Sequence, residues 1–455
     1  MPSRLVAQRL PWSDPVAIFT GGLGAQQHAF WLDAGPDADA GFSWMGVGTP
    51  ADDPPADVLL AASPHGRAYA TAPTDATDAT TIPGPFHGGW VGWSGYDTAA
   101  AAAGAPARVE DADGPPHVWL RTDWFLTIDH AARRMWVVGP LASMAEARER
   151  VAVWVAASQT VSAAPRRALD AGQATRVASA RHTASEYAAL IERCRDAIRT
   201  GDAYQLCLTT RFTVTAATAF DPVATYLALR SALPAHHGGF IRSGDTALLS
   251  ASPERFLEVR DAVVRTRPIK GTRPRGHDDT EDEELRRQLQ ESVKERAENV
   301  MIVDLMRNDL QRVCVPGTVV TERLLEVESY SAVHQLVSTV AGRLLAETTL
   351  GDLCAAAFPA GSMTGAPKLS AMTILHALEA GSRGLYAGCF GWVSADGAAD
   401  LAMTIRSVVL RPGGAYVGAG GGITWLSDAA EEVAEVGIKA RGPLAALGVG
   451  LPPGW

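Results

Sequence analysis

SEYAALIERCRDAIRTGDAYQLCLTTRFTV, residues 185–214, indicates which kind of fold this chain adopts. In its first half, apolar residues recur at i, i+3, i+4, i+7 and i+11, which predicts one stripe of a helix that Gly201 ends. The second half, AYQLCLTTRFTV, has the composition of a strand. Asp221 and Pro222 then form an N-cap pair for another helix, and strands are expected at GFIRS, TALLSAS and FLEVRDAVVRT. The sequence therefore predicts an α+β, or mixed α/β, fold.

The composition is that of an acidic globular protein. The 455 residues include 50 Asp and Glu against 40 Lys and Arg, a net charge of −10, and a nucleic-acid-binding protein usually has the opposite balance. No run of about 18 apolar residues predicts a membrane helix, and the opening stretch MPSRLVAQRLPWSDP lacks the apolar region of a signal peptide. Five dispersed cysteines without a CxxC pair fit a reducing compartment. We expect a cytoplasmic protein that binds neither nucleic acid nor a membrane.

Composition also divides the chain into regions. Residues 1–157 are rich in Ala, Gly, Asp and Pro, and their most distinctive stretch is FHGGWVGWSGYD, residues 86–97. Glycines in such an aromatic pattern are typical of strands that approach closely or bulge. Residues 158–180 are small and polar, which predicts a linker. The clearest helix and strand patterns fall in residues 181–445, which we predict to be the domain that carries the chemistry.

Two glycine-rich segments, GSMTGAPK (361–368) and GAGGGI (418–423), were candidates for phosphate-binding loops. Neither has the required spacing, because Ala366 stands where a P-loop needs its second glycine and Ile423 stands where a dinucleotide fingerprint needs its last. Nucleotide binding is therefore excluded at both segments. Their small residues could still let backbone N–H groups approach a carboxylate, with ordinary turns as an equal alternative.

Carboxylates recur at helical spacing in two predicted helices. Glu291, Glu295 and Glu298 share a face of a charged helix expected from Glu281 to about Leu310, and Glu432 and Glu435 share a face of a second helix. A solvated face is the ordinary outcome for a single such helix. Stacked like charges destabilise a helix by a few tenths of a kcal/mol unless a cation compensates, and two acidic helices together could hold one Mg²⁺, which prefers oxygen ligands.

The loop RTRPIKGTRPRG, residues 265–276, is strongly basic in this acidic chain. It is either a surface loop or a site for an anionic substrate, with Lys270 as a candidate nucleophile. A lysine has a pKa of about 10.4, and lowering it by about 3 units requires about 4 kcal/mol. Neighbouring arginines and a metal ion could supply that pressure, whereas Glu254 would oppose it if it lies close.

Seven segments occur in the order that is typical of chorismate-utilising enzymes. They are SPERF (252–256), PIKGTRPRG, AENVMIVDLMRNDLQRV, FPAGSMTGAPK, YAGCFGW, MTIRS, and GAGGGI followed by EEVAEVGIKA. The chain resembles this family over residues 184–442, and FHGGWVGWSGYD resembles the N-terminal region of its anthranilate-synthase-like members. The resemblance implies a two-subdomain α/β sandwich of mainly antiparallel sheets, with the active site between the subdomains.

The resemblance also implies roles for residues at matching motif positions. Glu298 and Glu435 would ligate Mg²⁺, and Glu295 and Glu432 would hold its water shell. Lys270 and Glu254 would be catalytic. The implied substrate-binding residues are Gly271, Thr272, Tyr386, Arg406, Gly420, Gly421, Gly422 and Lys439.

Lysine in PIKGT is typical of the family's aminodeoxychorismate synthases, and alanine there is typical of its anthranilate synthases. The resemblance thus implies Mg²⁺-dependent amination of chorismate with ammonia to 4-amino-4-deoxychorismate, a precursor of p-aminobenzoate and folate, through a covalent adduct on Lys270 with Glu254 as acid and base. Gln205 supports this, because isochorismate and salicylate synthases have a water-activating lysine there. Anthranilate synthase component I and a catalytically silent chorismate-binding subunit are the alternatives.

No cysteine lies in the GxCxG-like elbow of a glutaminase, so the resemblance implies a separate glutamine amidotransferase subunit as the source of ammonia. Three positions depart from the family pattern. Cys207 replaces a common asparagine and is interpreted as a small core residue. Gln335 replaces a histidine, which makes a histidine-dependent proton transfer there doubtful. His236 to Phe240 replace a segment associated with tryptophan binding, so we expect no tryptophan feedback site of the usual form.

Overall fold

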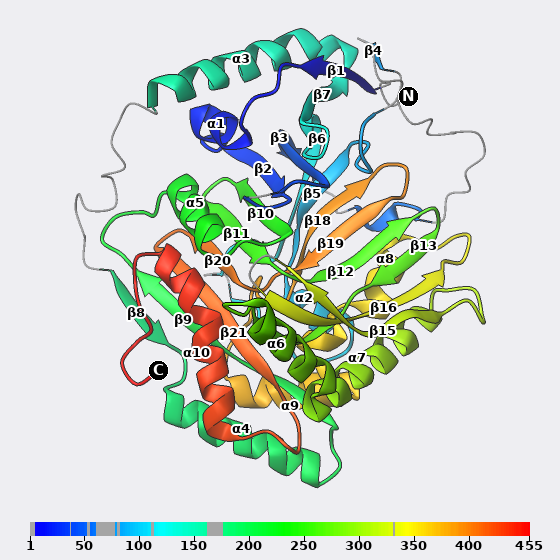
Figure 1. Cartoon of the computed structure of the whole chain (residues 1–455), viewed down its shortest axis with the longest axis vertical. Helices are drawn as coiled ribbons and strands as arrows, with labels where there is room; N and C mark the ends of the chain where they lie inside the picture. The colour runs from blue at the N-terminus through cyan, green and yellow to red at the C-terminus, as the bar shows by residue number, and fades with distance from the viewer. Residues whose placement is uncertain are drawn as a thin grey trace.

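The computed structural model describes residues 5–36, 38–51, 55–60, 78–79, 82–110, 113–161, 176–330 and 333–455. Their 21 strands form one connected antiparallel network. It branches at β6 (His117–Asp129), which pairs with β3, β5 and β7. The predicted α+β class with mainly antiparallel sheets is confirmed (Figure 1).

The first arm carries the strand that the opening sequence predicted. Outward from β6 it contains β3 (Phe42–Pro50), β2 (His28–Asp33), β10 (His237–Ser243), β11 (Thr246–Ser252), β20 (Ser407–Arg411), β21 (Gly414–Ile423) and β9 (Gln205–Thr215). The short strands β8 (Val177–Ala180) and β17 (Gly365–Ala366) pair with β9. On the other side of β6 lie β7 (Arg134–Pro140), β1 (Leu5–Leu10) and β4 (Asp78–Ala79).

The second arm leaves β6 through the FHGGWVGWSGYD segment. It contains β5 (Gly89–Ser94), β18 (Cys389–Ser394), β19 (Ala399–Met403), β12 (Arg255–Arg260), β13 (Val263–Thr266), β16 (Val333–Arg343), β14 (Ile269–Pro274) and β15 (Val320–Ser329). A Cβ on Gly92 would lie 1.9 Å from the Val118 carbonyl oxygen. The close approach of strands predicted from these glycines is therefore confirmed.

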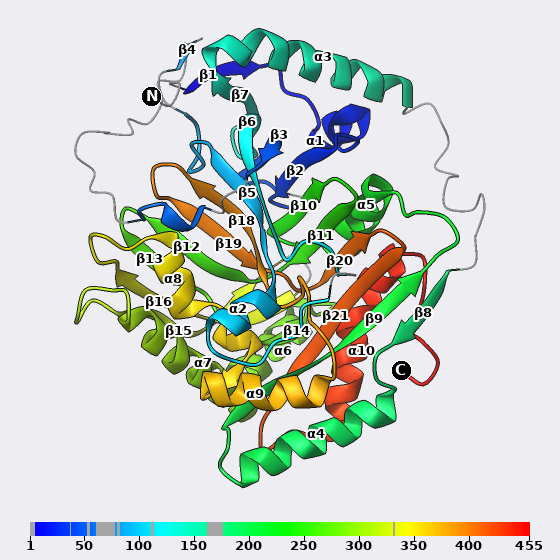
Figure 2. The ribbon, with the colours of Figure 1, turned by 180° about the vertical axis from the view of Figure 1, so that it is seen from behind.

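Buried aromatic side chains from both arms, among them Phe30, Trp93 and Trp392, form the core between the two layers. Helices cover the outer faces, as the two opposite views show (Figures 1 and 2). The first arm packs against α1 (Pro15–Ile18), α3 (Met144–Val161), α4 (Ala184–Arg199), α5 (Pro222–Ala232), α9 (Lys368–Glu379) and α10 (Ala429–Ala446). The second packs against α2 (Tyr96–Ala102), α7 (Val293–Gln311) and α8 (Leu350–Ala357).

Local capping explains where the helices begin. Thr183 forms a capping box with Glu186 at the start of α4, and the Asp221 carboxylate accepts hydrogen bonds from two backbone N–H groups of α5, as predicted. The prediction of a single charged helix from Glu281 is wrong. The segment is two helices, α6 (Asp279–Glu291) and α7, because Ser292 has extended backbone angles and caps Glu295 N.

Both ends of the predicted linker, residues 158–180, lie in regular structure, since α3 continues through Val161 and β8 begins at Val177. Residues 162–175 lie outside the described residues. Strands of the N-terminal region pair directly with strands of the rest, β2 with β10 and β5 with β18. The division into domains at residues 157 and 181 stays a prediction. Among the helices of the described ranges, none has both the length and the hydropathy to cross a membrane.

Candidate active site

Two acidic helix faces meet at one end of the sandwich. Helix α7 carries Glu295 and Glu298 and packs against β16, whereas α10 carries Glu432 and Glu435 and packs against β21 (Figure 1). Lys294 of α7 reaches across to α10, with its Nζ 3.0 Å from Glu432 Oε1. The structure thus brings together the four glutamates for which the sequence predicted a magnesium site.

Two of these carboxylates are deeply buried. Glu432 is 2% exposed and Glu298 is 7% exposed, and Oε1 of Glu298 has no hydrogen-bond partner among the described residues. Burial raises the pKa of Glu298 to about 7, with Lys270 opposing and Glu295 adding to the shift. A buried, unpartnered oxygen beside further carboxylates is the kind of donor that a hard divalent cation binds.

Glu435 differs from its neighbour Glu432. Its side chain is 49% exposed and lies 2.6 Å from Lys439 Nζ, so direct ligation by Glu435 would require this ion pair to be exchanged for the metal. In the ranges that the structure describes, no three His, Cys, Asp or Glu side chains are close enough to enclose an ion. The residues fit Mg²⁺ in their chemistry, and two of the four carboxylates are paired with lysines.

Lys270, in β14, lies against the glycine strand β21, where a Cβ on Gly422 would be 3.4 Å from its Nζ. Burial disfavours its charge, but the negative groups around it, Glu298 foremost, raise the pKa of Lys270 above its ordinary value. Glu254 contributes to this rise, as expected for a nearby carboxylate. In this arrangement Lys270 is an ammonium ion.

The arginines of the basic loop do not lower the pKa of Lys270, which corrects the sequence prediction. Arg265 pairs with Glu322 at 3.0 Å and Arg275 with Asp282 at 2.7 Å. Arg267 pairs with Glu328, and Arg273 lies 3.7 Å from Glu295. Their charges are thus compensated locally, and the loop's general excess of arginine was a misleading signal.

Glu254 follows β11 and is 8% exposed. Burial raises the pKa of this carboxyl to about 7, and Lys270 and the hydroxyl of Ser362 oppose the rise. A carboxyl that is partly protonated near neutral pH is suited to act as a general acid and then as a base. Glu254 and Lys270 are electrostatically coupled, as the predicted catalytic pair requires.

Glycines make room for the side chains of this site. A Cβ on Gly418 would lie 2.1 Å from the Tyr386 ring, and one on Gly421 would lie 3.0 Å from Glu432 Oε2. Gly271 has φ +85°, and a Cβ there would lie 2.7 Å from Leu289. No other residue type would fit at Gly271 without strain, which gives a physical reason for the glycine in PIKGT.

The remaining predicted substrate-binding residues surround the same strand. Tyr386 is buried, and Lys439 Nζ donates a hydrogen bond of 2.8 Å to the Gly420 carbonyl oxygen. Arg406 is half-buried with φ +51°, and burial lowers the pKa of its guanidinium, with Tyr386 and Glu435 opposing. Thr272 lies opposite Gln335 in the β14–β16 register.

Two of the three departures from the family pattern lie at this site. Cys207 is 4% exposed and belongs to a hydrophobic core cluster, as interpreted from the sequence, and its thiol is also within electrostatic reach of Lys270. Gln335 is 5% exposed. Its carboxamide does not titrate, so the doubt about proton transfer at this position stands.

Sequence reasoning missed two site residues. Lys294 lies four residues before Glu298, a spacing that places them on one helix face. The buried Arg383 donates to the Met363 and Cys207 carbonyl oxygens at 2.7 and 2.9 Å, and so connects the GSMTG segment to β9. The signal for Arg383 was weak, since a single arginine beside YAGCFGW has no distinguishing pattern.

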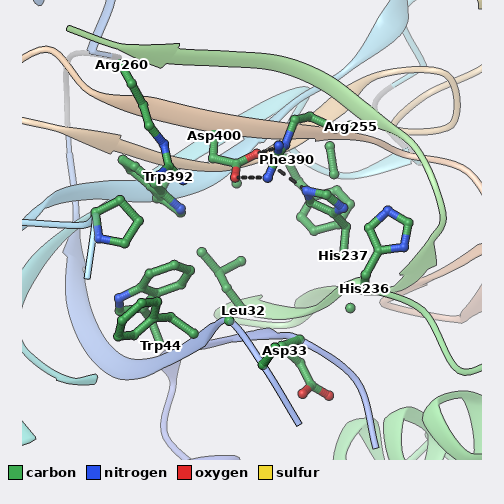
Figure 3. A pocket seen from close by; sticks show the side chains of 18 residues that line it. Leu32, Asp33, Trp44, His236, His237, Arg255, Arg260, Phe390, Trp392 and Asp400 are labelled. Carbon is green, nitrogen blue, oxygen red and sulfur yellow. Dashed lines mark hydrogen bonds and ion pairs between the residues drawn. The ribbon is translucent and has the colours of Figure 1, made fainter. Parts of the chain in front are cut away.

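A separate hollow of about 450 Å³ lies between the two layers (Figure 3). Trp44 and Trp392 line part of its wall, and His237 and Arg255 lie near Asp400, with Arg255 bound to that carboxylate at 2.9 Å. The predicted active-site residues are not among those that line it. His236, His237 and Gly238, from the segment that departs from the family pattern, line it. The absence of a tryptophan site of the usual form stays a prediction.

Comparison with known proteins decides the family. A family model described as chorismate binding enzyme matches residues 27–445. The chain belongs to the chorismate binding enzymes. An aminodeoxychorismate synthase from Streptomyces pristinaespiralis is 40% identical over 391 residues, which cover 82% of this chain and 52% of the relative. Aminodeoxychorismate synthase component 1 from Klebsiella aerogenes is 40% identical over 358 residues, 78% of this chain and 76% of the relative.

The chain therefore spans about half the length of the Streptomyces pristinaespiralis relative. Proteins named anthranilate synthase component 1 also match. Among solved structures, anthranilate synthase component I from Streptococcus pneumoniae TIGR4 superposes with a TM-score of 0.68 at 28% identity, covering 97% of this chain and 92% of that one. The predicted resemblance to chorismate-utilising enzymes is confirmed.

Proposed function

We propose that this chain aminates chorismate with ammonia to give 4-amino-4-deoxychorismate, the precursor of p-aminobenzoate and folate. The observation that carries the proposal is the position of Lys270, whose amine lies beside the buried Glu254 carboxyl and the acidic faces of α7 and α10. Relatives with alanine at the position of Lys270, as is typical of anthranilate synthases, have no amine there. The aminodeoxychorismate synthases among the relatives support the same activity.

In this proposal the substrate lies between β14, β21 and α10. Arg406 and Lys439 would bind its carboxylates, and backbone N–H groups of Gly420 to Gly422 would approach them closely because these positions lack side chains. Glu298 and Glu435 would hold Mg²⁺, with Glu295 and Glu432 around it. When bound there, Mg²⁺ supplies positive charge that offsets the glutamates and a substrate carboxylate.

The reaction would proceed in two displacements. The neutral amine of Lys270 forms a bond to C2 of the ring while the C4–O bond breaks, and the Glu254 carboxyl gives its proton to the departing hydroxyl, which leaves as water. Ammonia then forms a bond to C4 as the lysine nitrogen leaves C2 with its electron pair, and the Glu254 carboxylate accepts the proton that ammonia releases. Covalent catalysis thus divides one difficult displacement into two.

Lys270 must lose its proton before it attacks, and the carboxylates around it hold the proton on. The proposal therefore requires that their charge be offset in the loaded site. Gln205, whose buried Oε1 has no hydrogen-bond partner in the described part of the chain, is suited to orient ammonia. An amide cannot act as the base that would activate water at this position.

A separate glutamine amidotransferase is proposed as the source of ammonia. All five cysteines are free, four of them buried, and burial raises the pKa of the Cys314 thiol to about 11. Such thiols are poor nucleophiles at neutral pH. The name component 1 of the Klebsiella aerogenes relative also fits a chain that works with a partner.

Incubation with chorismate, Mg²⁺ and ammonium tests the proposal. We expect p-aminobenzoate only when a lyase for 4-amino-4-deoxychorismate is added. Anthranilate fluorescence without a lyase would instead assign the alternative activity, which the structural similarity to anthranilate synthase favours. Stabilisation by chorismate with no product from any amine donor would identify a silent binding subunit.

A further inference from the structure

Lys294 forms an ion pair between the two acidic helices. It occupies the first turn of α7, and its Nζ is 3.0 Å from Glu432 Oε1, an oxygen that also accepts a 2.8 Å hydrogen bond from Ser427 Oγ. The Glu432 side chain is 3% exposed, whereas that of Lys294 is 34% exposed. A cation that reaches solvent is thus paired with a buried carboxylate.

Two neighbouring carboxylates pair with other cations. Glu295 lies 3.7 Å from Arg273, and Glu435 lies 2.6 Å from Lys439. In the described ranges, no three acidic side chains are close enough to enclose an ion. In the proposed function Glu432 belongs to the water shell of the ion, so its carboxylate has to exchange Lys294 for those waters.

We propose that Lys294 is a built-in counter-cation of the metal site, which stabilises the acidic cluster when no metal is bound and leaves it when a divalent cation enters. The inference rests on the magnesium site of the proposed function. The long lysine stem and the partial exposure of its side chain give Nζ a path into solvent. Competition between Lys294 and the ion would weaken metal binding and keep it reversible.

Lys294→Met tests this, because methionine keeps most of the stem and removes the charge. Arg296→Met is the matched control, since Arg296 is exposed on the same helix and its guanidinium bonds the Gln290 carbonyl oxygen, away from the glutamates. Calorimetric titration with Mg²⁺ alone, on chelator-treated full-length protein, gives Kd. Thermal unfolding with and without Mg²⁺ gives an independent readout.

We expect Lys294→Met to bind Mg²⁺ about tenfold more tightly than the unmodified protein, the effect of one removed like charge near the ion. Its Tm without Mg²⁺ should fall and its Mg²⁺-induced rise in Tm should increase. Arg296→Met should match the unmodified protein in both. If Lys294→Met does not fold, Lys294→Gln takes its place in the same titration.

An unchanged or weaker Kd for Mg²⁺ in Lys294→Met would overturn the inference while leaving the proposed function intact. Weaker Mg²⁺ binding together with loss of chorismate binding would make Lys294 a substrate-binding residue instead, which also overturns it. If the unmodified protein releases no heat with Mg²⁺, the metal site of the proposed function fails first, and the inference fails with it.

Discussion

Gly422→Ala is the most informative single change, because the added methyl group would point into the centre of the site. Its Cβ would lie 2.5 Å from Gln205 Nε2 and 3.4 Å from Lys270 Nζ. Ordinary van der Waals contact begins near 3.4 Å, so the Gln205 amide would have to move away from the new methyl group by about 0.9 Å. Gln205 is 1% exposed, and a buried amide can retreat only by displacing its neighbours.

A displacement of about 1 Å at a reacting group can reduce the rate about 10²-fold, whereas overpacking costs about 1–3 kcal/mol of stability. We therefore expect kcat with ammonium to fall about 10²-fold in a protein that still folds. The coupled p-aminobenzoate assay gives kcat and KM, and thermal unfolding gives stability. Gly450→Ala is the control, since its Cβ would have no neighbour within 4 Å. A Gly422→Ala enzyme with the rate of the control would refute the placement of Gln205 and Lys270 over this glycine.

Four further changes test other parts of the account. Lys270→Ala should lose most of the activity with ammonia while Mg²⁺ and chorismate still raise Tm, and an undiminished rate would remove the lysine from the mechanism. Glu298→Gln should raise the half-saturating Mg²⁺ concentration at least about tenfold, because it removes the charge of a buried ligand; an unchanged titration would contradict the metal site. The pKa of Glu254 is raised to about 7, so its acid form is lost as the pH rises through that value, and kcat should decline there. Glu254→Gln should lower kcat about 10²–10⁴-fold and remove this decline from the pH profile. Burial raises the pKa of Asp97 from 3.8 to about 6, so the folded chain holds this proton more tightly than the unfolded chain. The free energy of unfolding should therefore fall as the pH rises from about 3.8 to about 6. Urea denaturation of Asp97→Asn should show a smaller fall over the same pH range.

Local sequence patterns predicted the elements well where one element carries its own signal. Helix α4 and strand β9 follow from the apolar stripe before Gly201 and from the β-branched and aromatic residues after it. The break at Ser292 was missed because the residues on both sides favour a helix, and a serine cap is visible only once the backbone angles are known.

The membership of the site stays a prediction from the family motifs, and its electrostatics could not be read from the sequence. The family motifs named Lys270 and the glutamates, and the fold brings them together. The loop arginines pair with residues of β15, α6 and α7 outside the loop, so the loop's net charge did not predict the direction of the pKa shift of Lys270. The pairing of Lys294 with Glu432 joins residues 138 apart in the chain, and spacing within one helix does not predict such a contact.

The central claim is that the Lys270 amine bonds to the chorismate ring. Mass spectrometry of the protein incubated with chorismate and Mg²⁺, with ammonia withheld, tests it directly. The account predicts a peptide containing residue 270 that is heavier by chorismate less one water, which disappears when ammonium is added and does not form in Lys270→Ala. Steady amination by a chain that never acquires this mass, or that acquires it at another residue, would contradict the account.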